Sequence, residues 1–290
     1  LILCPDNATF QQWADTIKQF RTEQGILTKV KTMTEIGGNT SADIENYINN
    51  AYNTWSIPPV AVLLLGDHGT DPSNSITSNV LTNHPGGYNP YVSDNPYADI
   101  DGDHLPDLAI ARITAQDGSD LDVMVNKFIN YETNPPVNPD FYDHPVTALG
   151  WQTTRWFQVC SESIGGFWKN ELGKNPVRIN AVYSGDPSVD PWSTAVNSST
   201  VLDYFGPNGC GYIPASPTEL GGWTGGSSTD VNNALNSGAF MLQHRDHGIW
   251  TGWGEPYYRN AQIDGLTNTD LTFIMSINCQ TGTRRAGIVI

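Results

Sequence analysis

The segment Val60-Ala-Val-Leu-Leu-Leu65 is a continuous apolar run, which is typical of a strand buried on both faces of a sheet. Two other strand-like segments, Leu1–Cys4 and Leu27–Val30, precede it, and an amphipathic helix separates each strand from the next. The apolar residues with helical spacing are Phe10, Trp13, Ile17 and Phe20 in the first helix, and Ile44, Tyr47, Ile48 and Tyr52 in the second. Strands that alternate with helices predict a parallel, doubly wound α/β sheet.

The same alternation continues to the end of the chain. Strand 108–113 and a helix over 121–129 complete the first half, and the Pro-rich segment 134–139 is the best internal boundary. The second half has strands at 146–151 and 177–183 and helices at 159–172, 195–204 and 231–235. We therefore predict an α/β fold with two subdomains, residues 1–138 and 139–290.

Two apolar runs near the C-terminus end on reactive side chains. Gly-Ala-Phe-Met-Leu-Gln-His-Arg-Asp-His-Gly (238–248) ends in His247 and Gly248, and Leu-Thr-Phe-Ile-Met-Ser-Ile-Asn-Cys (271–279) ends in Cys279. Sites in open α/β sheets form outside the carboxyl ends of the strands, so neighbouring strands of this kind would place an imidazole beside a thiol. The pattern predicts a Cys279 nucleophile with His247 as general acid/base, and an oxyanion hole made by the N–H groups of Gly248 and Cys279.

Two other histidines compete for this role. His244 lies three residues before His247, so strand alternation places it on the opposite face and deeper in the sheet. His68 follows the apolar run 63–65 in a similar His-Gly pattern, but no cysteine-ending strand follows at comparable spacing. His68 remains a candidate for lining the substrate cleft.

Closely spaced carboxylates occur in the segment Asp99-Ile-Asp101-Gly-Asp103. Carboxylate oxygens in a glycine-containing turn are ligands suited to Ca²⁺, so we predict a structural calcium site at Asp99, Asp101 and Asp103. The segment is not an EF-hand loop, because His104 stands where that loop needs glycine and no glutamate occupies its twelfth position.

Other residues are predicted to support catalysis. Asp107 immediately precedes strand 108–113, and a carboxylate there could orient His247 as the third member of a triad. Trp250 and Trp253 lie in the loop that follows His247, where they could form a wall of a substrate pocket.

The charge of the chain limits its partners. Among 290 residues, 30 are acidic and 14 are basic, which gives a net charge of -16. The electrostatic field of so much negative charge repels nucleic acid and favours cationic partners or divalent metals.

The sequence has no pattern of a membrane span or a signal peptide. No apolar stretch approaches the ~20 residues of a membrane span, and the opening on a strand without a signal peptide indicates a processed or trimmed region.

Taken in order, these segments resemble the gingipains and their relatives, peptidase family C25 of the caspase-like clan. The resemblance is carried by residues 62–67, residues 97–112, Asp246-His247-Gly248 and Asn278-Cys279. It implies two side-by-side, mostly parallel sheets flanked by helices, in a secreted or bacterial cell-surface endopeptidase with calcium sites and a propeptide. It also implies protein substrates, with Cys279 as nucleophile and His247 as general acid/base.

The resemblance has implications for specificity as well. Family members cleave after a basic residue that binds in an acidic pocket, for which Asp117 and Asp120 are the candidates here. Asp107 falls where the family has an acidic residue, often glutamate, near the histidine. Two alternatives remain: a processing peptidase or transpeptidase of a bacterial secretion system, and a non-catalytic, calcium-stabilised scaffold of the same fold. The intact pair of His247 and Cys279 argues for an enzyme.

Overall fold

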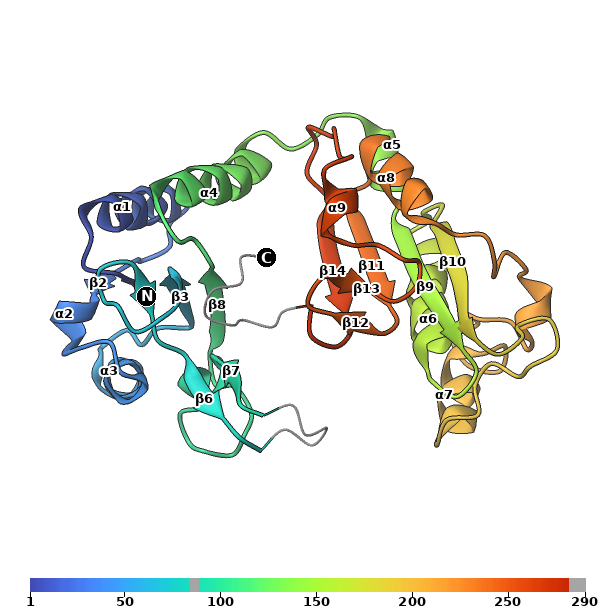
Figure 1. The fold of residues 1–290 in the computed structure, drawn as a ribbon, viewed down its shortest axis with the longest axis horizontal. Helices are drawn as coiled ribbons and strands as arrows, with labels where there is room; N and C mark the ends of the chain where they lie inside the picture. The colour runs from blue at the N-terminus through green and yellow to red at the C-terminus, as the bar shows by residue number, and fades with distance from the viewer. Residues whose placement is uncertain (84–88, 282–290) are drawn as a thin grey trace. The chain divides into compact units, whose positions relative to one another are not determined.

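The computed structural model describes residues 1–83 and 89–281, and the chain divides into two units between Thr133 and Asn134 (Figure 1). This division falls at the start of the Pro-rich segment 134–139. Each unit is built around a parallel sheet of four strands. The described residues contain no helix long and apolar enough to cross a membrane.

The first unit has the strand order β2-β1-β3-β8, and all the pairings are parallel. Its strands are β1 (Ile2–Cys4), β2 (Val30–Thr32), β3 (Ala61–Leu65) and β8 (Ala109–Ile113). The helices are α1 (Ala8–Glu23), α2 (Met33–Ile36), α3 (Ser41–Thr54) and α4 (Gly118–Thr133). The predicted parallel sheet is therefore confirmed. The second strand lies three residues later than we predicted, since Val30 pairs with Ile2 while Leu27 is exposed.

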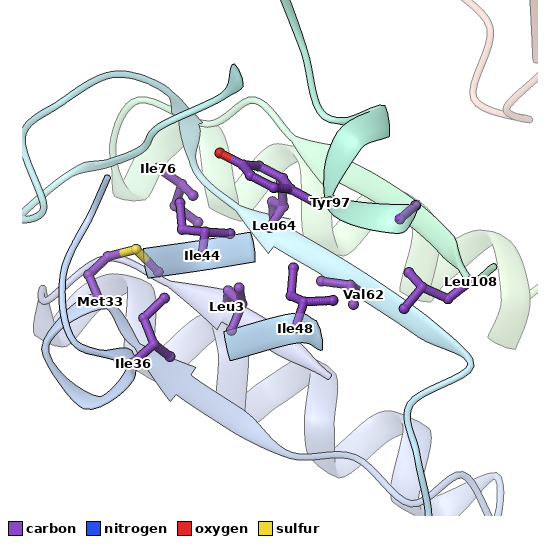
Figure 2. Packing of buried hydrophobic residues seen from close by; sticks show 11 residues of the cluster. Leu3, Met33, Ile36, Ile44, Ile48, Val62, Leu64, Ile76, Tyr97 and Leu108 are labelled. Atoms are coloured by element: carbon purple, nitrogen blue, oxygen red, sulfur yellow. The ribbon is translucent and has the colours of Figure 1, made fainter. Parts of the chain in front are cut away.

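Helices cover both faces of this sheet, as doubly wound topology requires. Buried residues of α1 and α4 form one core with Ile2 and Leu65. On the other face, Ile44 and Ile48 of α3 pack with Leu3, Val62 and Leu64, as Figure 2 shows. Burying these side chains contributes about 1.5–3 kcal/mol each.

A buried arginine organises the excursion between β3 and β8. The side chain of Arg112 is fully buried, and its guanidinium donates to both carboxylate oxygens of Asp94 at 2.8 Å and to the carbonyl oxygens of Gly66 and Ile76. The excursion contains two small ribbons and a 3₁₀ turn: β4 (Asp67–His68) with β5 (Ser75–Ile76), β6 (Asn79–Leu81) with β7 (Tyr91–Ser93), and η1 (Asn95–Ala98). Sequence periodicity did not predict these ribbons, because they are too short to show a pattern.

The second unit has the strand order β10-β9-β11-β14, again with parallel pairings. Its strands are β9 (Val146–Gln152), β10 (Val177–Ser184), β11 (Met241–Arg245) and β14 (Phe273–Ile277). A short hairpin, β12 (Gly248–Ile249) with β13 (Gly252–Trp253), follows β11. The helical elements are α5 (Pro139–Asp143), α6 (Phe157–Asn170), α7 (Ser198–Phe205), η2 (Pro217–Glu219), α8 (Ser228–Asn236) and α9 (Asn260–Ile263).

The central strand β9 separates two cores. Val146 and Ala148 belong to a core with buried residues of α8, whereas Leu149 and Trp151 belong to a core with buried residues of α6. This alternation follows from the two-residue period of a strand. Both faces of the sheet are thus covered at β9, whereas every residue of the edge strand β14 is exposed. The carboxyl ends of the strands are the place where a site can form.

Candidate active site

Four side chains follow one another along the carboxyl-end rim of the second sheet. In the spatial order of the strands they are Tyr183 near the end of β10, Gln152 at the end of β9, His247 after β11 and Cys279 after β14. Strands β11 and β14 are paired, with Arg245 opposite Ile277, so His247 and Cys279 each follow their paired strand end by two residues. The predicted neighbourhood of the two strands is confirmed.

Gly248 brings the backbone after His247 directly against the Cys279 segment. A Cβ placed on Gly248 would lie 2.5 Å from Asn278 Oδ1 and 2.7 Å from the carbonyl oxygen of Cys279. Any side chain at this position would push the two strand ends apart. The glycine therefore permits the close approach of the histidine and cysteine segments.

The imidazole of His247 is held by a neutral amide. Its Nε2 lies 2.7 Å from Oε1 of Gln152, and its ring contacts Tyr183 and Phe157 with centroid distances of 4.7 and 5.2 Å. With the carbonyl oxygen of Gln152 facing it, Nε2 carries the hydrogen and donates. The lone pair of Nδ1 is then available to accept a proton.

The surroundings of His247 favour its neutral form. Burial lowers its pKa below the ordinary value of 6.5, and the positive charges of Arg155 and Arg245 lower it further. A neutral imidazole at neutral pH is the form that can accept a proton from a thiol.

The neighbouring carboxyl of Asp246 is buried beneath the same loop. It is 1% exposed, its Oδ2 accepts the N–H of Glu255 at 2.6 Å, and it packs on Gly150, where a Cβ would collide with it. Burial raises its pKa to about 7, against the opposing effect of the N–H groups of His247 and Glu255. Asp246 therefore ties the chain after His247 to the loop that ends at Glu255.

Gln152 is the site residue that the sequence analysis missed. We expected Asp107 to orient His247, but Asp107 belongs to the first unit, and within the second unit the partner of His247 is Gln152. The sequence contained a sign of this role. Gln152 directly follows the predicted strand 146–151, just as His247 and Cys279 follow their strands. The orienting role of Asp107 stays a prediction.

Asp107 lies in the acidic loop of the first unit. Oxygens of Asp99, Asp101 and Asp107 come within 4.8 Å of one another, while Asp103 is not in this group and instead accepts the N–H of Leu105 at 2.8 Å. Asp107 also accepts the N–H of Ile100 at 2.7 Å. Three carboxylates at this spacing fit a hard cation such as Ca²⁺, and these are the residues that would hold it.

Three further candidates of the first unit have local structural partners. Asp117 accepts the N–H groups of Ser119 and Asp120 at the start of α4, and these bonds lower its pKa. Asp120 accepts the N–H of Gln116, and Nδ1 of His68 accepts the N–H of Ser78 at 3.0 Å. Their assignment to a substrate pocket stays a prediction.

The two tryptophans after His247 differ in exposure. Trp250 is 42% exposed, whereas Trp253 is 6% exposed and belongs to the core that contains α8. Trp253 therefore contributes packing rather than pocket surface, because its ring is already covered by the sheet. Of the two tryptophans, Trp250 is the one with an exposed side chain.

A parallel α/β sheet with a histidine and a cysteine at adjacent strand ends defines the class of the cysteine peptidases with a caspase-like fold. The chain belongs to peptidase family C25, whose family model matches residues 1–286. It is 21% identical over 245 residues to Lys-gingipain of Porphyromonas gingivalis, which covers 83% of this chain. The chain spans only 11% of the length of that relative.

Solved structures share this fold. The Arg-specific cysteine proteinase gingipain R (RgpB) superposes with a TM-score of 0.66 at 20% identity, covering 97% of this chain and 54% of the other. The complex of P. gingivalis RgpB pro- and mature domains also gives a TM-score of 0.66, at 17% identity, covering 96% of this chain and 55% of the other.

Proposed function

We propose that this chain is a cysteine endopeptidase with Cys279 as nucleophile and His247 as general acid/base. The observation that supports it most is the pairing of β11 with β14, with Gly248 packed against the backbone of Cys279. An inert thiol and an unrelated histidine would not need this approach. The residues also follow the order expected for family C25, to which the chain belongs.

In the proposed reaction, Nδ1 of His247 takes the thiol proton, and the sulfur of Cys279 forms a bond to the carbonyl carbon of the peptide. The N–H groups of Gly248 and Cys279 stabilise the oxyanion. His247 then gives its proton to the leaving amine as the C–N bond breaks. Water attacks the resulting thioester, His247 takes a proton from it, and the acid product leaves as the thiol is restored.

The proposed substrates are proteins, with cleavage after a basic residue. The names of the relatives support this, since one is a Lys-gingipain and another is Arg specific. We further propose inhibition by a propeptide, because one structural relative is a complex of pro- and mature domains. A secreted or bacterial cell-surface location is proposed from the resemblance to the gingipains.

The proposed function is tested by covalent labelling. Peptidyl chloromethyl ketones that end in arginine, lysine or leucine are each incubated with the protein, and the modified residue is mapped by mass spectrometry. We expect modification of Cys279, fastest with the basic reagents. Labelling by the leucine reagent alone would retain the peptidase and reject the basic preference. Failure of every peptidyl reagent would favour the scaffold of the same fold.

Replacing Gln152 by glutamate should change the pH dependence of labelling. A carboxylate beside Nε2 stabilises the imidazolium, so it raises the pKa of His247 and leaves less of the neutral form at low pH. We expect Gln152→Glu to react roughly 10-fold more slowly than the wild type at pH 5.5, and within about 3-fold of it at pH 8.

The matched control is Gln262→Glu, which adds the same charge in the second unit at a glutamine whose Oε1 accepts the N–H of Arg259 instead of facing His247. Measurement of the labelling rate from pH 5 to pH 9 separates the two. An unchanged low-pH limb in Gln152→Glu would contradict the contact between Gln152 and His247.

We propose that Asp99, Asp101 and Asp107 hold a structural Ca²⁺. Binding only to the folded state stabilises the first unit, by about 2.7 kcal/mol at a concentration 100 times the dissociation constant. We expect EGTA to lower the melting temperature of one calorimetric transition, and Asp99→Asn to abolish this difference. The control Asp15→Asn removes an equivalent charge from an exposed position of α1. An equal calcium response in Asp99→Asn and wild type would reject this site.

A further inference from the structure

His244 is the second histidine of strand β11, and it is fully buried. Its ring stacks in parallel on Trp253, with a centroid distance of 4.0 Å and an interplanar angle of 6°, and its Nε2 lies 3.1 Å from the carbonyl oxygen of Glu255. Burial lowers its pKa to about 3. His244 is therefore neutral, with its hydrogen on Nε2, and without contact with water it cannot serve as the general base.

The other ring nitrogen of His244 faces the residue before the proposed nucleophile. Nδ1 accepts a hydrogen bond of 2.8 Å from Nδ2 of Asn278, which directly precedes Cys279. Since Nδ1 must be unprotonated to accept it, the neutral state of His244 and this bond depend on each other. The bond joins residues that are 34 positions apart in the sequence.

The side-chain amide of Asn278 has further partners. Its Nδ2 also lies 2.9 Å from Oγ of Ser276, which accepts the indole N–H of Trp253 at 2.8 Å. Its Oδ1 accepts the hydroxyl of Thr281 at 2.5 Å. The amide is therefore held by groups from β11, β14 and the segment after Cys279, and it has little freedom to rotate.

We propose that His244 is a positioning residue for Cys279, acting through Asn278. By fixing the side chain of Asn278, His244 fixes the peptide between Asn278 and Cys279, which carries both the thiol-bearing residue and an N–H of the proposed oxyanion hole. The same amide lies against Gly248, so its placement also sets the distance between the histidine and cysteine segments. This inference rests on the proposed function.

The test uses His244→Phe and Asn278→Leu, singly and together. Phenylalanine retains the stacking on Trp253 but removes both hydrogen bonds of the ring, whereas leucine removes the amide. We expect each single variant to react with a peptidyl chloromethyl ketone about 100-fold more slowly, because a displacement near 1 Å has an effect of that size. Since both changes break one shared bond, the double variant should be about as slow as either single variant.

A small thiol reagent distinguishes positioning from a general structural effect. Iodoacetamide does not use the oxyanion hole or the peptide-binding surface, and at about pH 9.5 a thiol ionises without help from His247. We therefore expect its rate at Cys279, measured at this pH, to stay within about 3-fold of the wild type. The control Tyr258→Phe removes another hydrogen bond from the same core, the one from the Tyr258 hydroxyl to Asn232. It should lower the melting temperature without a selective loss of peptidyl labelling.

The outcomes separate the two hypotheses. A wild type that no peptidyl reagent labels would overturn both the peptidase and the positioning role. A labelled wild type with His244→Phe reacting at the same rate would overturn only the positioning role. An equal loss with iodoacetamide, or fully multiplicative losses in the double variant, would also overturn it.

Discussion

Replacement of Cys279 by serine should abolish peptide hydrolysis. A serine hydroxyl is far less acidic than a thiol. His247 is held by the neutral Gln152, which does not stabilise an imidazolium as a carboxylate would, so His247 is a poor base for a hydroxyl. Because nucleophile and base act as a unit, we expect turnover to fall by about 10⁵-fold or more. The measurement is the initial rate with a chromogenic peptide that ends in arginine or lysine.

The fold should tolerate this change, because Cys279 is exposed at the strand end. The free energy of unfolding should stay within about 0.5 kcal/mol of the wild type. Cys160→Ser is the matched control, since Cys160 is also a free, exposed cysteine of the second unit, and it should leave the rate unchanged. Retained hydrolysis in Cys279→Ser would assign the nucleophile to another residue.

Replacement of His247 by alanine should lower the rate by about 10³- to 10⁴-fold. The loss should be accompanied by a change in the pH profile. In the wild type the rate falls as pH drops through the pKa of His247, which burial and the nearby arginines hold below 6.5, because protonation removes the acceptor. In His247→Ala this acidic limb should disappear.

His144→Ala is the control for this substitution. His144 is a half-exposed histidine of the same unit that lies 3.4 Å from Asp143, just before the amino end of β9, and its removal should change neither the rate nor the pH profile. Persistence of the acidic limb in His247→Ala would assign this limb to another group, and Asp246 is the neighbour whose raised pKa of about 7 falls in that range. The buried His244 would not explain it, because its pKa is lowered to about 3.

The sequence was sufficient to predict the elements that depend on local pattern. Apolar residues at helical spacing predicted α1 and α3, and the continuous run at residues 60–65 predicted the buried strand β3. The prediction that strands ending in His247 and Cys279 are neighbours is also confirmed by their pairing. Local spacing determines which face of an element is apolar, and therefore which elements pack into a parallel sheet.

The contacts of the candidate site depended on the tertiary structure. Gln152 meets His247 across 95 residues of sequence, and no local pattern distinguishes it from other polar residues that follow strands. The same holds for Asn278, whose partner His244 lies 34 positions away in the sequence. It also holds for Trp253, which is buried and stacks on His244.

The sequence by itself therefore determined the parallel α/β architecture and the two strand ends that carry a histidine and a cysteine. Only the tertiary structure decided that a neutral amide holds His247, and that a second, buried histidine holds the residue before Cys279. The physical reason is that strand order and register set these contacts, and they arise from the packing of all elements together. Apolar periodicity can be read from the local sequence, whereas the partner of a polar side chain depends on the tertiary structure.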